Sequence, residues 1–320
     1  MRIGIDLGGT KIEALALSDT GELLWCERIA TPVQSSNQSE NYHAIVCGIS
    51  DLVNKIEHDT GMIGSVGVGT PGSVSALTKG MKNSNTVCLN GRPLQLDLQT
   101  KLNRPIRLAN DADCMVLSEA TDGAAAGAKS VFGVILGTGV GGGLVINQTL
   151  LQGVNGIAGE WGHNPIPAGL IGPHAVPRSC YCGAQNCVET WLSGVGLLQS
   201  YQTQVQKQAD TNQRLEQGAS AEEVVVLATQ GDACAVLAMD TYAAQLAGAL
   251  ALVINIVDPE VIVLAGGLSN IEQLYTDVPK QWATSVFSDK IETQLVQAQH
   301  GDSSGVRGAA WLWPALSPMA

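Results

Sequence analysis

Short apolar runs alternate with small turns near the start of the chain, which predicts β-strands joined by tight connections. The runs are strand-length and rich in Ile, Leu and Ala, and glycine stands in the turns between them. They cover residues 3–7, 12–17 and 23–30. Between residues 45 and 56 the apolar residues recur at 3.6-residue spacing, on one face of a helix, so a helix is predicted there. Two more short strands are predicted at 66–69 and 106–108.

The second half of the chain opens with the same pattern. An apolar strand over 131–136 leads into a glycine-rich turn, and a returning strand is predicted over 144–146. Further on we expect helices at 188–206, 221–230 and 233–256, followed by a strand at 261–264. Two halves that each begin with strand, glycine turn and strand indicate a duplicated α/β unit with a cleft between its lobes.

Composition and charge exclude several classes of protein. The 320 residues carry 29 acidic and 17 basic side chains, a net charge of -12, so we expect no nucleic-acid partner. The longest apolar stretch, Leu246–Ile254, is far below the ~20 residues that a membrane span needs, so no membrane partner is expected. Asp6 interrupts the first apolar run, which rules out a signal-peptide core there. A cytoplasmic protein is therefore expected, with its eight cysteines as thiols or metal ligands.

The turn after the first strand carries groups suited to phosphate and magnesium. Gly8 and Gly9 let backbone N–H groups approach phosphate oxygens, which a Cβ would prevent. Thr10 adds a hydroxyl and Lys11 an ammonium, and we expect the carboxylate of Asp6 to reach a magnesium ion through water. An ordinary hairpin turn is the alternative interpretation of the same motif.

The glycine-rich turn at 137–142 imitates a dinucleotide-binding fingerprint. It reads Gly-Thr-Gly-Val-Gly-Gly after a strand, with the acidic Glu160 downstream. That fingerprint requires a helix to begin at the turn, whereas residues 143–147 are typical of a strand. We therefore reject a nicotinamide cofactor, and the sequence contains no Walker A motif either.

Asp111 is the candidate general base. It stands with Asn110 at the end of a predicted strand and the start of a helix, where a cleft would place a reactive group. A carboxylate there can take the proton from an attacking alcohol. The alternative is that Asp111 only caps the helix, since Asp is a preferred N-cap residue.

Three cysteines within eight residues, with a histidine upstream, predict a metal site. His163, Cys180, Cys182 and Cys187 supply the four ligands of a closed tetrahedral zinc site. Four protein ligands leave no open position, which favours a structural zinc over a catalytic one. Buried thiols or a disulfide are the alternative. The other cysteines are dispersed and expected to be plain buried thiols: Cys26, Cys47, Cys88, Cys114 and Cys234.

The order and spacing of four motifs resemble the ROK family of sugar kinases and repressors over the whole chain. The motifs are Asp6-x-Gly8-Gly9-Thr10-Lys11, Gly137-Thr138-Gly139-x-Gly141-Gly142, Glu160-x-Gly162-His163 and Cys180-x-Cys182-x-x-x-x-Cys187-x-Glu189. Within that family the chain most resembles bacterial fructokinases of the mannofructokinase type. Residues 162–167 and 300–311 carry this closer likeness.

The resemblance implies a fold and an assembly. It implies an α/β, actin-like (ribonuclease H-like) fold, in which two duplicated lobes form an ATPase with a cleft between them. The small lobe is expected at residues 1–109 plus about 300–320, and the large lobe at 110–299 with the zinc-binding loop. A homodimer is also implied.

The resemblance also assigns roles to residues. Asp111 matches the catalytic base, and His163 matches a residue that binds zinc with one ring nitrogen and a sugar hydroxyl with the other. The turns around Gly9-Thr10 and Thr138-Gly139 match the phosphate loops, and Gly266-Gly267 matches the adenosine-binding turn. The residues matched to sugar hydroxyls are Asn85, Asn110, Glu160, His163 and Glu189. The zinc ligands match His163, Cys180, Cys182 and Cys187.

The activity implied is transfer of the γ-phosphate of MgATP to the 6-hydroxyl of a hexose, most simply fructose to fructose 6-phosphate. N-acetylglucosamine, mannose and glucose kinases of the same family are the alternatives. A sugar-sensing regulator is the alternative from a different class. We disfavour it because the first strand begins at Ile3, which leaves no room for a DNA-binding helix-turn-helix, and because Asp111 is present.

Two features depart from the family pattern. Sixteen residues separate His163 from Cys180, and we expect this stiff segment to border the sugar pocket or an oligomer contact. It contains Pro165, Pro167, Pro173 and Pro177. Cys88 stands where related fructokinases often carry Trp, which bears on the sugar preferred.

Overall fold

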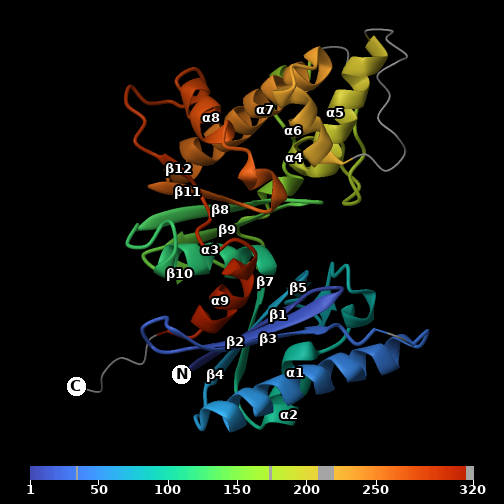
Figure 1. Cartoon of the computed structure of the whole chain (residues 1–320), viewed down its shortest axis with the longest axis vertical. Coiled ribbons are helices and arrows are strands. Elements are labelled where there is room, and N and C mark those ends of the chain that lie inside the picture. Colours follow the sequence, from blue (N-terminus) through green and yellow to red (C-terminus); the bar gives the residue numbers. More distant parts are fainter. Residues whose placement is uncertain (34, 173–174, 208–219, 315–320) are drawn as a thin grey trace. The chain divides into compact units, whose positions relative to one another are not determined.

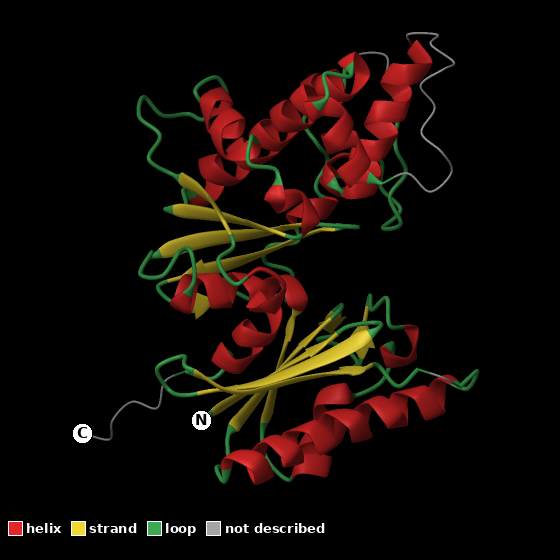
Figure 2. Ribbon diagram, viewed as in Figure 1, coloured by secondary structure: helices red, strands yellow, loops and turns green. Residues whose placement is uncertain are grey.

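The computed structural model describes residues 1–33, 35–172, 175–207 and 220–314, and it contains two five-stranded sheets (Figures 1 and 2). The first sheet has the strand order β3-β2-β1-β4-β7. Its first three strands are antiparallel neighbours, and β4 and β7 continue the sheet in parallel. The strands are β1 (Arg2–Leu7), β2 (Lys11–Leu17), β3 (Leu23–Ala30), β4 (Ser65–Thr70) and β7 (Ile106–Asn110). This confirms the strand–turn–strand start predicted from the sequence.

Helices cover both faces of the first sheet. On one face lie α1 (Gln38–Thr60) and α2 (Leu94–Leu102), and Figure 1 shows α3 (Asp111–Asp122) and α9 (Ser304–Trp311) on the other. The side chain of Asn37 accepts a hydrogen bond from the Ser39 N–H at 2.9 Å and so begins α1. The apolar stripe of α1 packs against β1, β2 and β4, as its helical spacing predicts.

Helix α9 comes from the far end of the sequence and packs very closely on the first sheet. Gly4 of β1 and Gly67 of β4 face it, and a Cβ at either position would overlap the α9 backbone. Gly308 of α9 in turn lies against the α3 backbone, where a Cβ would overlap the carbonyl of Cys114. Three glycines therefore allow backbone-to-backbone contact among the two strands, α9 and α3.

A buried carboxylate fastens the segment before α9 to α3. Glu119 of α3 has no exposed surface, and its Oε1 accepts from the His300 N–H at 3.0 Å and the Ser304 hydroxyl at 2.7 Å. Its Oε2 accepts from the N–H groups of Ala124 at 2.8 Å and Gln299 at 2.9 Å. Burial favours the neutral acid, but these four hydrogen bonds outweigh it and lower the pKa of Glu119.

The second sheet has the order β10-β9-β8-β11-β12. Its strands are β8 (Ser130–Leu136), β9 (Val140–Ile146), β10 (Thr149–Leu150), β11 (Val261–Ala265) and β12 (Gln294–Gln297). β11 runs parallel to β8 and β12, whereas β10 is antiparallel to β9. A small hairpin of β5 (Ser73–Val74) and β6 (Met81–Lys82) lies outside both sheets.

The helices of the second half surround α7 (Ala233–Val257). Its neighbours are α4 (Val188–Leu192), α5 (Gly194–Lys207), α6 (Ala221–Thr229) and α8 (Leu274–Trp282). The helix predicted over 188–206 is therefore two helices, because the Gly194 N–H bonds to the carbonyl of Gly137 rather than continuing α4. In the described chain α7 alone is long and apolar enough for a membrane span, yet 67% of its apolar window is buried inside the protein. A core helix accounts for that composition.

The chain divides into two compact units. The first contains residues 1–127, 143–158 and 299–320, and the second 128–142 and 159–298; residues 315–320 lie outside the described part. The first unit includes α3 because that helix packs on α9. The lobes predicted at 1–109 with 300–320 and at 110–299 remain a prediction.

Candidate functional site

In the first unit, residues 8–10 form the turn between β1 and β2. The Gly8 N–H donates to the carbonyl of Lys11 at 2.9 Å, and the Thr31 hydroxyl donates to the carbonyl of Gly8 at 2.8 Å. Gly9 and Thr10 are exposed. The turn therefore holds an exposed backbone and hydroxyl in a fixed conformation, which suits a phosphate loop, although a plain hairpin would have the same hydrogen bonds.

Asp6 lies at the end of β1, where negative charge accumulates. Burial, and then the charge of Asp111, raise the pKa of the Asp6 carboxyl to about 6. Gly69 and Gly305 border this carboxyl without filling the space, since a Cβ on either would lie 3.7 or 3.3 Å from its oxygens. Carboxylate oxygens and excess negative charge are what Mg²⁺ requires, so these residues fit that ion.

Asp111 is the first residue of α3 and is exposed. The preceding Asn110 is the N-cap residue, because its Oδ1 accepts from the Ala112 N–H at 2.8 Å. Asp111 Oδ1 also lies 2.8 Å from the same N–H. Because Asn110 already caps the helix, capping alone does not require a carboxylate at position 111.

Asn85 belongs to a loop that lies near both the turn at residues 8–10 and the start of α3. Its neighbour Thr86 has its hydroxyl 3.6 Å from where a Cβ on Gly9 would stand. Gly72 joins the loop to α3, because Asn110 Nδ2 donates to its carbonyl at 3.2 Å and a Cβ on Gly72 would meet the Ser84 nitrogen at 2.8 Å. The first unit therefore gathers Asp6, the turn at 8–10, the Asn85 loop and Asp111 in one region.

In the second unit the glycine-rich turn leads directly into strand β9. This confirms the strand predicted after the turn, whereas a dinucleotide fingerprint requires a helix at that point. The Val140 N–H donates to Glu189 Oε2 at 3.1 Å, and a Cβ on Gly139 would lie 2.7 Å from the same oxygen. Glu189, at the start of α4, therefore lies against the predicted phosphate loop.

Glu160 directly precedes a short 3-10 turn, η2 (Trp161–His163), and His163 is the last residue of that turn, which packs on the same loop. The Trp161 indole N–H donates to the carbonyl of Gly141 at 3.1 Å, and its ring meets Phe132 edge-on with centroids 5.8 Å apart. A Cβ on Gly162 would overlap the carbonyl of Val140. The structure thus brings Glu160, His163 and Glu189 together around the turn at 137–142.

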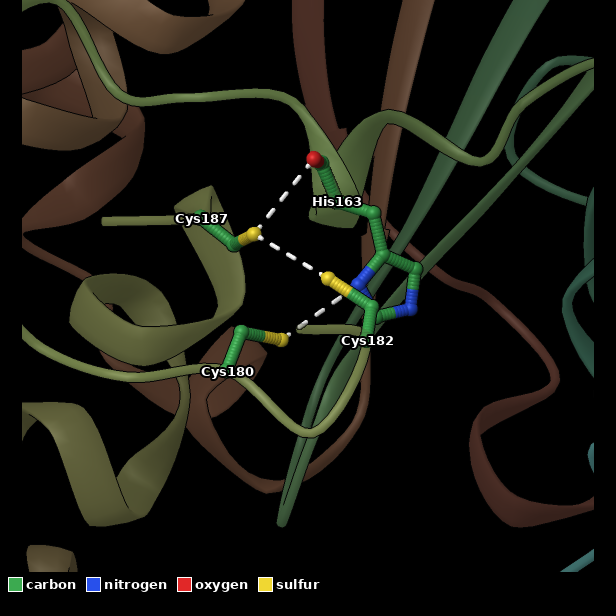
Figure 3. Close-up of side chains that lie close together, drawn as sticks. All are labelled: His163, Cys180, Cys182 and Cys187. Carbon is green, nitrogen blue, oxygen red and sulfur yellow. Dashed lines mark hydrogen bonds between the residues drawn. The ribbon is translucent and has the colours of Figure 1, made fainter. Parts of the chain in front are cut away.

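The four predicted metal ligands converge (Figure 3). One ring nitrogen of His163 and the three sulfurs all lie within 4.8 Å of one another. His163 Nδ1 is 3.5 Å from Cys180 Sγ, and the Cys182 and Cys187 sulfurs are 3.6 Å apart, which is too far for a disulfide. The Ala184 N–H is the main cause that lowers the pKa of Cys182 to about 7, while burial raises that of Cys187 to about 12. This donor set and spacing fit a tetrahedral Zn²⁺.

A buried arginine holds the cysteine loop to the helices, and sequence reasoning missed it. Arg178 donates to the carbonyls of Thr190 and Gly196 at 2.7 and 2.9 Å and lies 3.7 Å over the Trp191 ring. Burial lowers its pKa to about 10. Its partners are main-chain carbonyls, the Trp191 ring and the Ser200 hydroxyl at 2.9 Å. None of them is charged, so no charge pattern in the sequence points to this arginine.

The remaining predicted residues are placed as follows. Gly266 follows β11 with φ +83°, and a Cβ there would lie 2.5 Å from the carbonyl of Leu136, so glycine is required before Gly267.

Of the proline-rich segment between His163 and Cys180, Leu170 packs on α7, while Pro173 lies outside the described residues. Cys88, Cys114 and Cys234 are buried as expected, but Cys26 is exposed and Cys47 is half-buried, so those two expectations were wrong.

Each half of the chain begins with a strand, a glycine turn and a second strand, and helices pack on the sheets that these strands form. This repeat defines the duplicated actin-like α/β class. A sequence profile of the ROK family matches residues 2–315. The chain therefore belongs to the ROK family. The ROK hexokinase from Thermus thermophilus has a TM-score of 0.82 at 26% identity, with 97% of both chains covered. A ROK family glucokinase from Streptomyces griseus, in complex with glucose and AMPPNP, has 0.73 at 27% identity, covering 97% of this chain and 98% of that one.

Curated relatives correct the expected subfamily. The N-acetyl-D-glucosamine kinase of Photobacterium profundum is 39% identical over 315 residues, which cover 98% of this chain and 99% of the relative. The protein of the same name from Vibrio cholerae is 37% identical at the same coverage. The likeness to fructokinases is not supported, and the alternative of an N-acetylglucosamine kinase agrees better with these relatives.

Proposed function

We propose that this chain is an ATP-dependent sugar kinase that phosphorylates the 6-hydroxyl of N-acetyl-D-glucosamine. The observation that carries the proposal is identity of 36 to 39% over nearly the full length with relatives that bear that kinase name. The two groups of candidate residues, one in each unit, contain the chemical groups that such a reaction needs.

Phosphoryl transfer requires positioning of the nucleophile and stabilisation of charge on the transferred group. Asp111 would accept the proton of the 6-hydroxyl as that oxygen attacks the γ-phosphorus and the bond to the β-phosphate oxygen breaks. Backbone N–H groups of residues 8–10 and 137–139, with Thr10 and Thr138, would stabilise the phosphoryl oxygens. Lys11 adds a positive charge to the first turn, and Gly266-Gly267 would receive the adenosine.

Magnesium, when bound near Asp6, would neutralise charge on the phosphates. Zinc, when bound to His163 and the three cysteines, would hold the cysteine loop in place and so fix Glu189 and His163 relative to each other. The sugar hydroxyls would then be bound by Asn85, Asn110, Glu160, His163 and Glu189. A homodimer in the cytoplasm remains a prediction.

A coupled assay with purified protein, ATP and magnesium over a panel of hexoses tests the activity. We expect kcat/KM for N-acetyl-D-glucosamine to exceed that for fructose, glucose and mannose by at least ~10-fold, the scale on which one extra group in a pocket is discriminated. The variant Asp111→Asn, prepared in parallel, controls for contaminating kinases. Preference for an unacetylated hexose would refute the sugar assigned here, and the absence of any turnover would refute the kinase.

A further inference from the structure

A tyrosine stands between two of the metal-ligand cysteines and contacts the ligand histidine. Tyr181 follows Cys180 and precedes Cys182, and its hydroxyl lies 3.0 Å from His163 Nε2. The two rings meet edge-to-face, with centroids 5.1 Å apart and planes at 88°. Tyr181 is 79% exposed, so burial does not force it into this position.

The histidine ring has one nitrogen for the metal and one for another partner. Figure 3 shows Nδ1 turned toward the sulfurs and Nε2 turned away from them. The Nε2 position is therefore the one left for a sugar hydroxyl in the proposed function, on which this inference rests. In this structure the Tyr181 hydroxyl lies at that nitrogen.

We propose that Tyr181 competes with the sugar for His163 Nε2: its hydroxyl binds the nitrogen in the sugar-free protein and leaves when a sugar hydroxyl takes its place. Both partners are hydroxyl groups of similar hydrogen-bonding capacity, so one replaces the other without a change of histidine protonation. Tyr181 is free to turn outward because, among the described residues, its hydroxyl has no other hydrogen-bond partner. Competition therefore lowers the affinity of the protein for any sugar that binds at Nε2.

The competition has a measurable size. A neutral hydrogen bond of this kind contributes a net 0.5–1.5 kcal/mol, which corresponds to about 2- to 12-fold in a binding constant. Removing the tyrosine hydroxyl should therefore tighten sugar binding by about that factor. If Tyr181 instead oriented His163 as a zinc ligand, removing its hydroxyl would weaken zinc binding, typically about 10- to 100-fold.

Isothermal titration of N-acetyl-D-glucosamine into zinc-loaded protein without ATP tests the inference. Tyr181→Phe keeps the ring and removes only the hydroxyl, and Tyr181→Leu removes both. Tyr275→Phe is the matched control, because that hydroxyl donates to the carbonyl of Ser269, outside the histidine site. We expect a lower Kd for both Tyr181 variants, no change for the control, and zinc release to a chromogenic chelator at the wild-type rate in all.

Weaker sugar binding in Tyr181→Phe together with faster zinc release would overturn competition and make Tyr181 a support for the metal ligand. An unchanged Kd would show that the hydroxyl does not occupy the sugar position. If the wild type bound a different hexose, the proposed function would fail, and the same comparison made with that hexose would still decide the role of Tyr181.

Discussion

Replacement of Glu119 by Gln should destabilise the first unit strongly. Each carboxylate oxygen of Glu119 accepts two hydrogen bonds, and three of the four donors are main-chain N–H groups, which cannot accept. A glutamine amide supplies one accepting oxygen, so its NH₂ group would face at least one of these N–H groups; the Ser304 hydroxyl could donate to the carbonyl of Gly301, 2.9 Å away, instead. Two charge-assisted bonds are lost and at least one buried N–H loses its partner, at a cost of about 3–5 kcal/mol.

Urea unfolding followed by circular dichroism measures this change, with Glu272→Gln as an exposed control of the same charge change. The variant should also show faster amide hydrogen exchange at Gln299 and His300, the residues that Glu119 binds. A midpoint equal to that of the wild type, with unchanged exchange at these amides, would refute the argument that the carboxylate holds this segment.

The pH dependence of the unfolding free energy follows from the direction in which the pKa of Glu119 is shifted. The pKa of Glu119 is lowered in the folded protein, so its stabilising contribution is complete above the unfolded value of about 4.3 and declines as pH falls through the folded value. The difference in unfolding free energy between wild type and Glu119→Gln should therefore be constant from pH 6 to 8. It should narrow only below about pH 4, where the wild-type carboxylate becomes protonated.

Two further predictions concern the catalytic and metal residues. Asp111→Asn should lower kcat by on the order of 10²–10⁴ with unchanged circular dichroism, because the base is lost while Asn110 still caps α3; near-normal turnover would exclude Asp111 as the base. Metal analysis of protein purified without chelator should find one zinc per chain, and Cys187→Ser should reduce that content and the thermal stability together. If wild-type protein contained no zinc, the three cysteines would be ordinary thiols and not metal ligands.

Local patterns allowed the first sheet and the metal cluster to be predicted from the sequence. The strands β1 and β2 pair across a turn of three residues, and the cysteines lie within one short loop, so neighbours in sequence are neighbours in space. Strand β12 was missed because its four residues, Gln294–Gln297, alternate only weakly and pair with a distant strand. Helix α8, with Pro279 inside it, was missed for a similar reason.

Residues whose partners lie far away in the sequence could not be assigned a role from local patterns. Glu119 has an ordinary helical position, and its burial depends on Gln299 and His300, about 180 residues away in the sequence. Arg178 was missed for another reason: its partners lie only 12 to 22 residues away, but they are uncharged main-chain, hydroxyl and aromatic groups. The preferred sugar could not be derived either, because kinases for different hexoses share these motifs and differ by contacts worth one or two kcal/mol.

The close fit of α9 against β1 and β4 has a consequence for synthesis on the ribosome. Strands β1 and β4 are translated well before residues 304–311, which cover one face of their sheet. Until then Gly4 and Gly67 face no helix, and that side of the nascent sheet stays open to chaperones and to aggregation. The first sheet therefore cannot bury this face until residues 304–311 have been translated.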